Sequence, residues 1–400
     1  MTQPGVNATP RPAARALERG ETPQVLIVGA GPVGLFLGCC LALRGVSFGI
    51  VEARSASAGH SRAIGVHPPA LERLAAVGLA EAMLARGVPI RRGLAFAGRR
   101  RLGAVAFSSC PPPYAFVLSL PQIETEALLA ARLERLAPGT LERGLRLVSL
   151  REDAAGVTLG LEGPGGPTTR RAAFVVGCDG SRSAVRRLAG FGWRGGSYPD
   201  RYLMGDFADH TDLGTDAAIH LCGAGLVESF PLPGARRRWV LRRDARDPAQ
   251  DAEPSAEGLA ASLLERLGHA PDPASHTMLS AFGIERRLAT PLARGRVLLA
   301  GDAAHVVSPI GGQGMNLGWL DAWDAAATLE GLLGRGSGSG VEAYARRRTR
   351  AAREAARRAA FNTLLGRRTR FGPLRAIMVR LMLRPPFARA FARRFTMRGL

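Results

Sequence analysis

The 400-residue sequence predicts an α/β fold that ends in a set of helices. Three observations lead to this prediction. Residues 24–54 read as strand, turn, helix and strand, and two later apolar runs, at 172–187 and 296–318, also pass into turns rich in Gly and Asp. Part of segment 191–284 alternates like the strands of a sheet. Residues 341–400 read mostly as helix. The length suits two or more domains, and an apolar content of 46% is enough for a large core.

The most specific signal lies in residues 24–54. The apolar run VLIV is typical of a buried parallel strand, and Gly29, Gly31 and Gly34 follow it in the pattern G-x-G-x-x-G. In that order the glycines are expected to allow a tight turn, the approach of a pyrophosphate and close packing of a helix. Glu52 ends the second strand, where a carboxylate can accept hydrogen bonds from a ribose diol. The segment therefore predicts a Rossmann-like site for FAD or NAD, and this motif alone does not choose between them.

Two further turns favour the longer ligand. One contains Asp179 in the sequence VVGCDG, and the other contains Asp302 and His305 in GDAAHVVSPIGGQGMNLG. Three such turns must converge if they serve one ligand, and FAD is long enough to cross several strand ends. His305 is open to two interpretations, a general base or a histidine that packs near the cofactor, and the sequence favours the second. No Ser-His-Asp set and no metal-ligand cluster is present, so no metal site is predicted.

Together these motifs resemble the FAD-dependent aromatic hydroxylases, the flavoprotein monooxygenases of the para-hydroxybenzoate hydroxylase type, and the C-terminal region looks like that of the ubiquinone-hydroxylase-like branch. The resemblance covers roughly residues 25–333. It implies a Rossmann-like FAD-binding domain interwoven with an antiparallel-sheet substrate domain, plus C-terminal helices. The predicted divisions are a disordered leader at 1–22, the FAD-binding domain at 23–89, 118–190 and 285–335, the substrate domain at 90–117 and 191–284, and an Arg-rich C-terminal helical region at 336–400.

The same resemblance assigns cofactor contacts. It implies that Arg62 lies by the pyrophosphate, that Gln122 contacts the cofactor and that Asp302 binds a ribityl hydroxyl. Backbone of a glycine-rich helix start would meet the pyrimidine end of the flavin, where reduced flavin develops negative charge. The predicted cofactor-binding residues are Gly29, Gly31, Gly34, Glu52, Ala53, Arg62, Gln122, Asp179, Asp302, Pro309, Gly312, Gly314, Met315 and Asn316.

The substrate pocket is less well defined by the sequence. Its candidates are His220, Cys222, Glu228 and Phe230, in a segment that resembles the sheet over the flavin in this family. Because side chains alternate along a strand, 220 and 222 lie on one face of the sheet, and 228 and 230 also share a face. The pattern does not say which face meets the substrate. For each of the four, a structural role is the favoured interpretation.

The formal net charge is +21, and every basic residue is Arg. Residues 341–400 hold 17 Arg and two acids, so most of the excess lies there. The favoured interpretation is a pair of helices that packs on the flavin domain with Arg outward. The alternative is a basic amphipathic surface for an anionic membrane. No nucleic-acid-binding motif accompanies the charge, so no specific nucleic-acid partner is predicted.

Two features bear on location. The five cysteines form no C-x-x-C motif, which fits a reducing cytoplasmic setting. Peripheral membrane contact through the C-terminal region is compatible with this location. The uncharged run 25–43 is long enough for a membrane span, but Pro32 and the glycine turn interrupt it, and a buried strand and helix are expected instead.

The predicted activity is an FAD-dependent monooxygenase. By the resemblance, NAD(P)H would reduce FAD as a transient partner, and a flavin C4a-hydroperoxide formed with O2 would hydroxylate or epoxidise an aromatic, polyketide or lipophilic small molecule. One alternative is a flavin-dependent reductase of isoprenoid double bonds on the same fold. Another is a non-catalytic flavoprotein whose basic tail binds membrane or nucleic acid.

Overall fold

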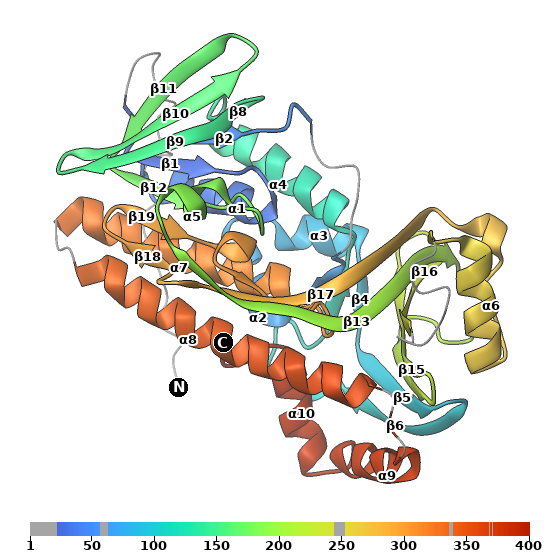
Figure 1. Cartoon of the computed structure of the whole chain (residues 1–400). Helices are drawn as coiled ribbons and strands as arrows, with labels where there is room; N and C mark the ends of the chain where they lie inside the picture. Colours follow the sequence, from blue (N-terminus) through green and yellow to red (C-terminus); the bar gives the residue numbers. More distant parts are fainter. Residues whose placement is uncertain (1–21, 57–62, 244–252, 336–338, 368, 370) are drawn as a thin grey trace.

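The computed structural model describes residues 22–56, 63–243, 253–335, 339–367, 369 and 371–400 (Figure 1). The predicted leader lies outside the described residues except for residue 22, and so does Arg62. The described part has mixed α/β architecture with one mainly parallel sheet, one large antiparallel sheet and C-terminal helices, which confirms the predicted fold class.

A six-stranded sheet carries the nucleotide motifs. Its order is β18 (Ala293–Arg294), β19 (Val297–Leu299), β12 (Phe174–Gly177), β1 (Val25–Val28), β2 (Phe48–Glu52) and β8 (Leu141–Arg143). All pairs are parallel except β18 with β19. Because the parallel strands run together, the turns after β1, β12 and β19 meet at one edge. The three motifs that lie far apart in the sequence therefore converge.

Both faces of this sheet are covered, and the side chains of β1 show how. Val25 and Ile27 belong to the core shared with the helices α1 (Pro32–Leu43), α4 (Gln122–Leu136) and α7 (Gln313–Arg335). The alternate residues Leu26 and Val28 belong to a second core, shared with a three-stranded antiparallel sheet. That sheet has the order β11 (Gly166–Ala172), β10 (Gly156–Gly163) and β9 (Arg146–Asp153) and lies at the top of Figure 1.

The uncharged run 25–43 is thus β1, the glycine turn and α1, and most of its residues are buried. Within the part of the chain that the structure describes, no helix is both long and apolar enough to cross a membrane. The unusual hydrophobicity of the run follows from its position, because both the strand and most of the helix are covered on all sides.

The second large sheet has eight strands. Its order is β20 (His305–Val306), β17 (Met278–Thr290), β13 (Gly192–Ala208), β16 (Arg236–Arg243), β15 (Gly225–Leu232), β14 (Ala217–Cys222), β5 (Arg92–Ala97) and β6 (Arg100–Ala106). All neighbours are antiparallel except β14 and β5. The early hairpin β5–β6 thus joins strands from the middle of the chain. The long pair β13–β17 runs from this sheet to the nucleotide-binding half, and β17 passes without a break across the expected boundary at residue 285 (Figure 1).

The outer face of the eight-stranded sheet is covered by α6 (Ala256–Leu267). Apolar side chains of β13 and β16, such as Phe207 and Trp239, pack there against Leu259 and Leu263. A small sheet of β3 (Gly65–Val66), β7 (Val117–Ser119) and β4 (Val88–Ile90) lies between the two halves. The remaining short elements are α2 (Pro68–Ala76), α3 (Ala80–Arg86), α5 (Ala184–Leu188) and the 3-10 turns Phe107–Ser109, Pro273–Ser275 and Gly301–Ala303.

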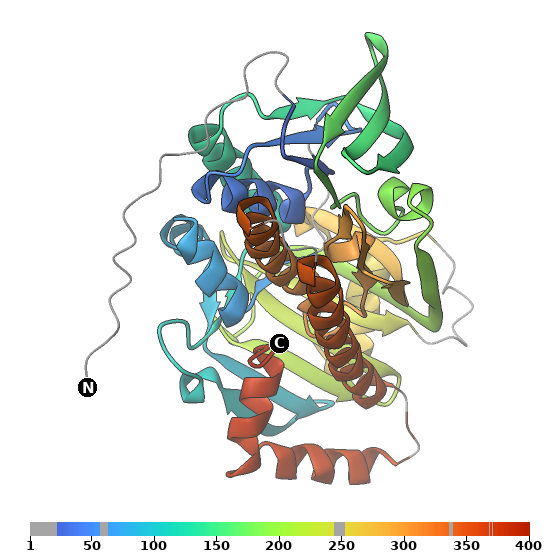
Figure 2. The same ribbon diagram turned by 90° about the vertical axis from the view of Figure 1, so that its left-hand side faces the viewer.

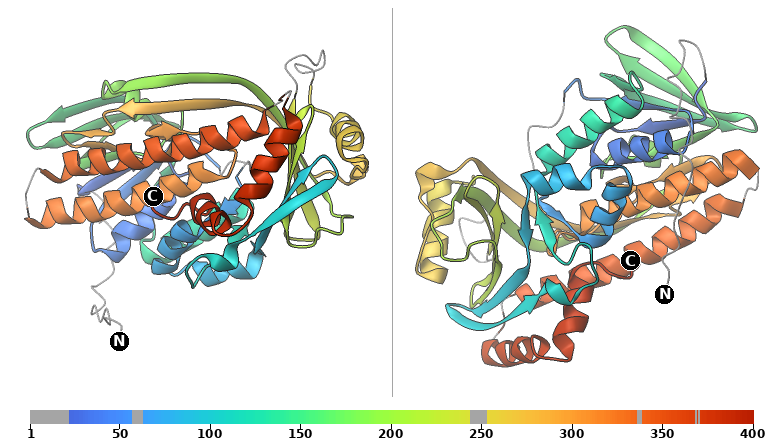
Figure 3. Two further views of the ribbon diagram at one scale, coloured as in Figure 1. Left: turned by 90° about the horizontal axis from the view of Figure 1, so that it is seen from below. Right: turned by 180° about the vertical axis from the view of Figure 1, so that it is seen from behind.

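The helices after α7 pack in two different places. Helix α8 (Ser339–Gly366) packs along α7 and β18, in the nucleotide-binding half, as Figure 2 shows. Helices α9 (Gly372–Met382) and α10 (Phe387–Phe395) instead contact β6 and the turn at Phe107–Ser109, at the far end of the eight-stranded sheet (Figure 3). The expectation that the terminal helices pack on the flavin domain is therefore correct for α8 and wrong for α9 and α10, because α8 is long enough to carry the chain to the other sheet.

The two tryptophans of α7 pack against the protein, Trp319 fully buried and Trp323 partly buried. Trp319 donates a hydrogen bond from Nε1 to the carbonyl of Pro32, 3.0 Å away. The guanidinium groups of Arg44 and Arg73 lie 4.5 and 5.2 Å from the ring centre of Trp323. Neither tryptophan lines the large cavity described below, so neither limits the size of a substrate.

Candidate functional site

A cavity of about 860 Å³ runs from the glycine turn after β1 to the inner face of the eight-stranded sheet. Most of the predicted site residues line it. These are Gly29, Gly31, Glu52, Ala53, Gln122, Asp179, Asp302, Pro309, Gly312, Gly314 and Met315, together with Glu228 and Phe230 at the sheet. Gly34, Asn316, His220 and Cys222 do not line it. Arg62 lies outside the described residues.

The three glycines of the first turn have different surroundings. Gly29 has a φ of +106°, and a Cβ there would lie 2.5 Å from the carbonyl oxygen of Cys178. A Cβ on Gly34 would collide with the carbonyl oxygen of Gly29. At Gly31, in contrast, no atom lies within 4 Å of the Cβ position, which faces the cavity. Gly29 and Gly34 are thus required by the protein's own packing, whereas Gly31 leaves room for a ligand.

Glu52 connects the end of β2 to the glycine turn. Its Oε2 accepts a hydrogen bond from the amide of Ala30 (2.7 Å), and its Oε1 accepts from the amide (2.9 Å) and Nε (3.0 Å) of Arg54. Burial by itself would raise the pKa of Glu52, but the hydrogen bonds from Arg54 and Ala30 outweigh it and lower the pKa. The side chain is therefore an anion at neutral pH, and a carboxylate has further lone pairs for a ligand hydroxyl.

Two aspartates face the middle of the cavity. Asp302 lines the cavity and is exposed to it, and desolvation by the surrounding protein raises the pKa of its carboxyl. Asp179 uses Oδ2 to accept hydrogen bonds from the amides of Ala184 (2.6 Å) and Val185 (3.1 Å), at the start of α5. Its Oδ1 is buried and has no hydrogen-bond partner in the described structure. Each aspartate can therefore accept a hydrogen bond from a ligand.

The glycine-rich segment before α7 forms the far wall of the nucleotide-binding part. Gly311 and Gly312 have φ values of +92° and +66°, so the chain turns sharply there before the helix begins at Gln313. The first turn of a helix has amide groups without intrahelical partners, and Gly314 and Met315 of this turn line the cavity. This arrangement suits a ligand that carries partial negative charge at that end.

Asn316 holds this wall in place instead of lining the cavity. Its Oδ1 accepts a hydrogen bond from the amide of His67 (2.8 Å), and its Nδ2 donates to the carbonyls of Gly65 and Gly312, both 2.8 Å away. The ring of His67 reaches back to the carbonyl of Gly311 at 3.1 Å. Burial lowers the pKa of His67 to about 4, so the ring is neutral at physiological pH. His67 was not predicted, and no local sequence signal marks it.

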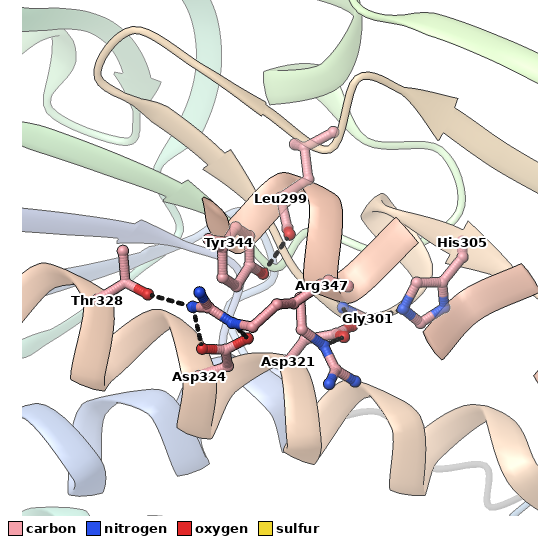
Figure 4. A network of polar contacts seen from close by, with 9 residues as sticks. Leu299, Gly301, His305, Asp321, Asp324, Thr328, Tyr344 and Arg347 are labelled. Atoms are coloured by element: carbon pink, nitrogen blue, oxygen red, sulfur yellow. Dashed lines mark hydrogen bonds and ion pairs between the residues drawn. The ribbon is translucent and has the colours of Figure 1, made fainter. Parts of the chain in front are cut away.

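His305 faces a buried ion-pair network (Figure 4). Its Nε2 lies 2.5 Å from Oδ2 of Asp321, which also accepts a hydrogen bond from the amide of Gly301 at 3.0 Å. The other oxygen of Asp321 accepts from Nε of Arg348 on α8, 2.6 Å away. His305 does not line the cavity, which supports the packing interpretation over the general base.

Asp321 and Arg348 are the partners that sequence reasoning missed. Burial would raise the pKa of Asp321, but His305 and Arg348 outweigh it and lower the pKa. The available signal was an acid between apolar residues of a helical run, since an acid at such a position is buried only when it is paired. Arg348 lies among many similar arginines, so nothing local distinguishes it.

The inner face of the eight-stranded sheet closes the other end of the cavity. Met204, Ile219, Glu228 and Val240 stand side by side on four neighbouring strands, and all four line the cavity. Opposite them, α9 and α10 contribute apolar side chains, including Leu383 and those of Val379, Met382, Phe391 and Phe395. We call this end the apolar chamber. Glu228 is an ionisable side chain among these apolar groups; it is only 5% exposed, and burial raises its pKa to about 7.

The structure corrects the pocket prediction for His220 and Cys222. They alternate with the cavity-lining Ile219 and Leu221 along β14, so they point to the opposite face of the sheet. His220 stacks on Phe96 at 4.5 Å between ring centres, and Cys222 packs in the core beneath α6. The hydrophobic pattern of β14 did not choose the face, because both faces are buried.

The unpaired carboxyl of Glu228 leads to a prediction about stability and pH. Burial raises the pKa of this carboxyl from the ordinary value of 4.5 to about 7, so the protonated form stabilises the fold below pH 4.5 and this contribution is lost as the pH rises to 7. Glu228→Gln should therefore gain stability relative to wild type across that interval, by on the order of 3 kcal/mol at pH 8. Urea denaturation of the cofactor-free proteins at a series of pH values measures the difference. The control Glu285→Gln, at a half-exposed position of β17, should give a difference that does not vary in this way, and an equal pH dependence of both would contradict the prediction.

The network of Figure 4 leads to a second prediction. Asp321→Asn should lower the free energy of unfolding by roughly 3–5 kcal/mol, because the buried Arg348 loses its counter-ion. Asp324→Asn is a matched control, since Asp324 lies one turn further along α7 and pairs with Arg347, which is half exposed. It should cost less than about 1 kcal/mol. Chemical denaturation measures the free energy of unfolding of both variants. Similar losses of stability would show that the buried Asp321–Arg348 pair contributes no more than the exposed pair.

Comparisons with known proteins agree with this geometry. The chain is 35% identical over 317 residues to 6-methylpretetramide 4-monooxygenase of Streptomyces rimosus, and this alignment covers 78% of this chain and 56% of that protein. It is 34% identical over 334 residues to 3-(3-hydroxy-phenyl)propionate/3-hydroxycinnamic acid hydroxylase of Mycobacterium sp. (strain JLS), with 80% and 56% covered. The chain therefore spans little more than half the length of these curated relatives.

A solved structure gives the same result for the fold. The OxyS anhydrotetracycline hydroxylase from Streptomyces rimosus superimposes with a TM-score of 0.78 at 31% identity, over 95% of this chain and 77% of that one. The profile of the family described as "FAD binding domain" matches residues 22–359, which include every turn that meets at the cavity. The chain thus belongs to the FAD binding domain family.

Proposed function

We propose that the protein is an FAD-dependent monooxygenase that uses NAD(P)H and O2 to hydroxylate or epoxidise an aromatic or polyketide-like small molecule. The observation that carries this proposal is the single cavity that joins the nucleotide motifs to the apolar chamber. A cofactor in the first part would present one end to a substrate in the second. The names of the relatives, which include monooxygenases and hydroxylases of ring compounds, support the same activity.

The residues at the first part of the cavity fit FAD. The open space at Gly31 admits a pyrophosphate, which a side chain there would exclude. Glu52 suits the ribose diol, and the unpaired Oδ1 of Asp179 and the carboxyl of Asp302 can accept hydrogen bonds from hydroxyl groups between the two ends. Bound FAD would accept a hydride from NAD(P)H and activate O2. The first turn of α7 would stabilise negative charge at the pyrimidine end of the ring.

The apolar chamber supplies the rest of the function. The sheet forms its floor and the helices α9 and α10 cover it, so a substrate there is shielded from water. Exclusion of water favours oxygen transfer to substrate over loss of reducing equivalents, because it protects reactive groups from side reactions. The protein's own contribution is thus to position the substrate and to keep the chamber dry.

The proposal is tested with protein reconstituted with FAD. NADH and NADPH are supplied in parallel with a panel of hydroxyaromatic and polycyclic compounds under ¹⁸O2. The expected result is substrate-stimulated oxidation of one nicotinamide and a product that contains one ¹⁸O atom. Reduction of a substrate double bond without oxygen would favour a reductase, and failure to bind FAD would overturn the proposal.

The first glycine turn gives a prediction that separates ligand binding from folding. Gly31→Ala should leave the stability of the cofactor-free protein nearly unchanged but weaken FAD binding, because the new Cβ enters the open space for the ligand. Gly34→Ala should lower the stability itself, since its Cβ collides with backbone. Thermal unfolding of the apoproteins and fluorescence titration with FAD measure the two effects. Equal loss of stability in both variants would contradict this division.

We also propose that α9 contacts an anionic membrane surface, from which a lipophilic substrate enters. Its outer face exposes Phe371, Leu374, Ile377 and Leu381, at 71%, 64%, 57% and 54%, and exposed arginines such as Arg380 lie beside them. Apolar side chains bordered by cations are typical of helices that lie at a lipid interface.

Flotation with phosphatidylserine vesicles tests this contact. Wild type should float, and the variant Leu374→Ser with Ile377→Ser should not, because both side chains lie outside the cavity and leave its lining intact. High salt should also prevent wild type from floating with the vesicles. Equal partitioning of both proteins would overturn the membrane contact, and a concentration-dependent dimer lost in the variant would show that the face binds a second copy instead.

A further inference from the structure

Glu228 is an ionisable group in the apolar chamber that the proposed chemistry does not use. It lies in the middle of β15, between Ile219 of β14 and Val240 of β16, which stand directly opposite it. Its side chain points into the cavity and is 5% exposed. Within the described residues its carboxyl makes no hydrogen bond and no ion pair, and burial is the only cause that acts on its pKa. A buried carboxyl without a partner is costly unless a ligand supplies one.

Most other polar groups near this end of the cavity already have partners. The hydroxyl of Tyr202 is the exception among the groups named here: it is buried without a hydrogen-bond partner in the described structure, and burial, followed by the charge of Glu228, raises its pKa. Nε and an Nη of Arg238 donate to the two oxygens of Asp206, at 2.6 and 2.8 Å. The hydroxyl of Ser119 donates to the carbonyl of Pro231 at 2.6 Å. The ionisable groups on the neighbouring elements are Tyr202 of β13, Arg238 with Asp206, and Arg242 and Arg367, which both pair with Asp200. None of these cations pairs with Glu228, so its charge is not neutralised by the protein.

The neighbours of Glu228 also limit what it can bind. Ile219, Val240 and Met204 present only apolar atoms, which suit the flat face of an aromatic ring. A carboxylate on the substrate would meet the charge of Glu228 without a free cation to compensate it, since Arg238 is held by Asp206. An ether oxygen would offer no donor. A hydroxyl group is the simplest substituent that can donate a hydrogen bond to the carboxylate.

We propose that Glu228 accepts a hydrogen bond from a ring hydroxyl of the substrate and thereby selects hydroxylated aromatic compounds over their ethers and over aromatic carboxylates. The inference rests on the proposed monooxygenase function, because it names the substrate class of that same site. Glu228 is thus a specificity-determining side chain of β15. Its place in the register of this strand determines which ring position is held.

The test uses three naphthalene probes that differ in one substituent: 1-naphthol, 1-methoxynaphthalene and 1-naphthoate. Each is titrated into FAD-loaded protein at pH 8, above the carboxyl's pKa of about 7, and binding is followed by the change in flavin absorbance. The proteins compared are wild type, Glu228→Gln, Glu228→Leu and the surface control Glu285→Gln. The flavin content of each protein is measured first, so that a loss of cofactor is not mistaken for a loss of probe binding.

Wild type and Glu285→Gln should bind 1-naphthol about 10-fold or more tightly than 1-methoxynaphthalene, as expected for a hydrogen bond to a charged acceptor. Glu228→Gln, which keeps a neutral acceptor, should retain part of this preference. Glu228→Leu should bind the two probes about equally and should bind 1-naphthoate more tightly than wild type does. Leucine removes the unpaired carboxyl without adding a polar group, so this variant should remain folded.

Two results would overturn the inference: wild type that shows no preference for 1-naphthol, including no binding of either probe, and Glu228→Leu that keeps the preference. The assay of nicotinamide oxidation is scored separately. Intact probe selection without oxygen incorporation would contradict the monooxygenase proposal alone. Oxygen incorporation without probe selection by Glu228 would contradict the present inference alone.

Discussion

The buried carboxylate of Asp321 joins the parts of the protein on which the cavity depends. It binds the amide of Gly301 in the turn after β19, the ring of His305 at the edge of the large sheet, and Arg348 on α8. These contacts connect the six-stranded sheet, the eight-stranded sheet and the C-terminal helices at one point (Figure 4). A buried charge requires such partners, and each partner is therefore held in a defined position. The turn that carries Asp302 is placed by this requirement.

From this anchor the cavity extends in two directions with different chemistry. Towards β1 and β2 it is lined by glycine backbone and carboxylates, which suit a long polar ligand with phosphate and hydroxyl groups. Towards the large sheet it is lined by aliphatic and aromatic side chains, under the cover of α9 and α10. The two halves share one space because β13 and β17 run from one sheet region to the other. The junction of polar and apolar walls is where cofactor and substrate would meet.

Much of this organisation was predictable from local patterns. The glycine turn, Glu52 and the segment around Asp302 have signatures that depend on nearby residues only, and the structure brings them to one edge of a parallel sheet. The contact of Asn316 with the cofactor stays a prediction: its side chain supports the wall through His67, and the residue does not line the cavity. The packing of α9 and α10 on β6 escaped prediction, because an amphipathic pattern shows that a helix has an apolar face but not what covers it.

The sequence by itself determined the class of fold and the kind of cofactor, because tight turns, close backbone contacts and strand ends impose residue types at fixed short spacings. Only the tertiary structure decided which face of β14 and β15 meets the cavity. Alternation defines two faces, and α6 covers the one that holds His220 and Cys222 while Glu228 and Phe230 line the other. It also decided that Asp321 pairs with Arg348, since an ion pair between two helices depends on how the helices pack and not on their spacing in the chain.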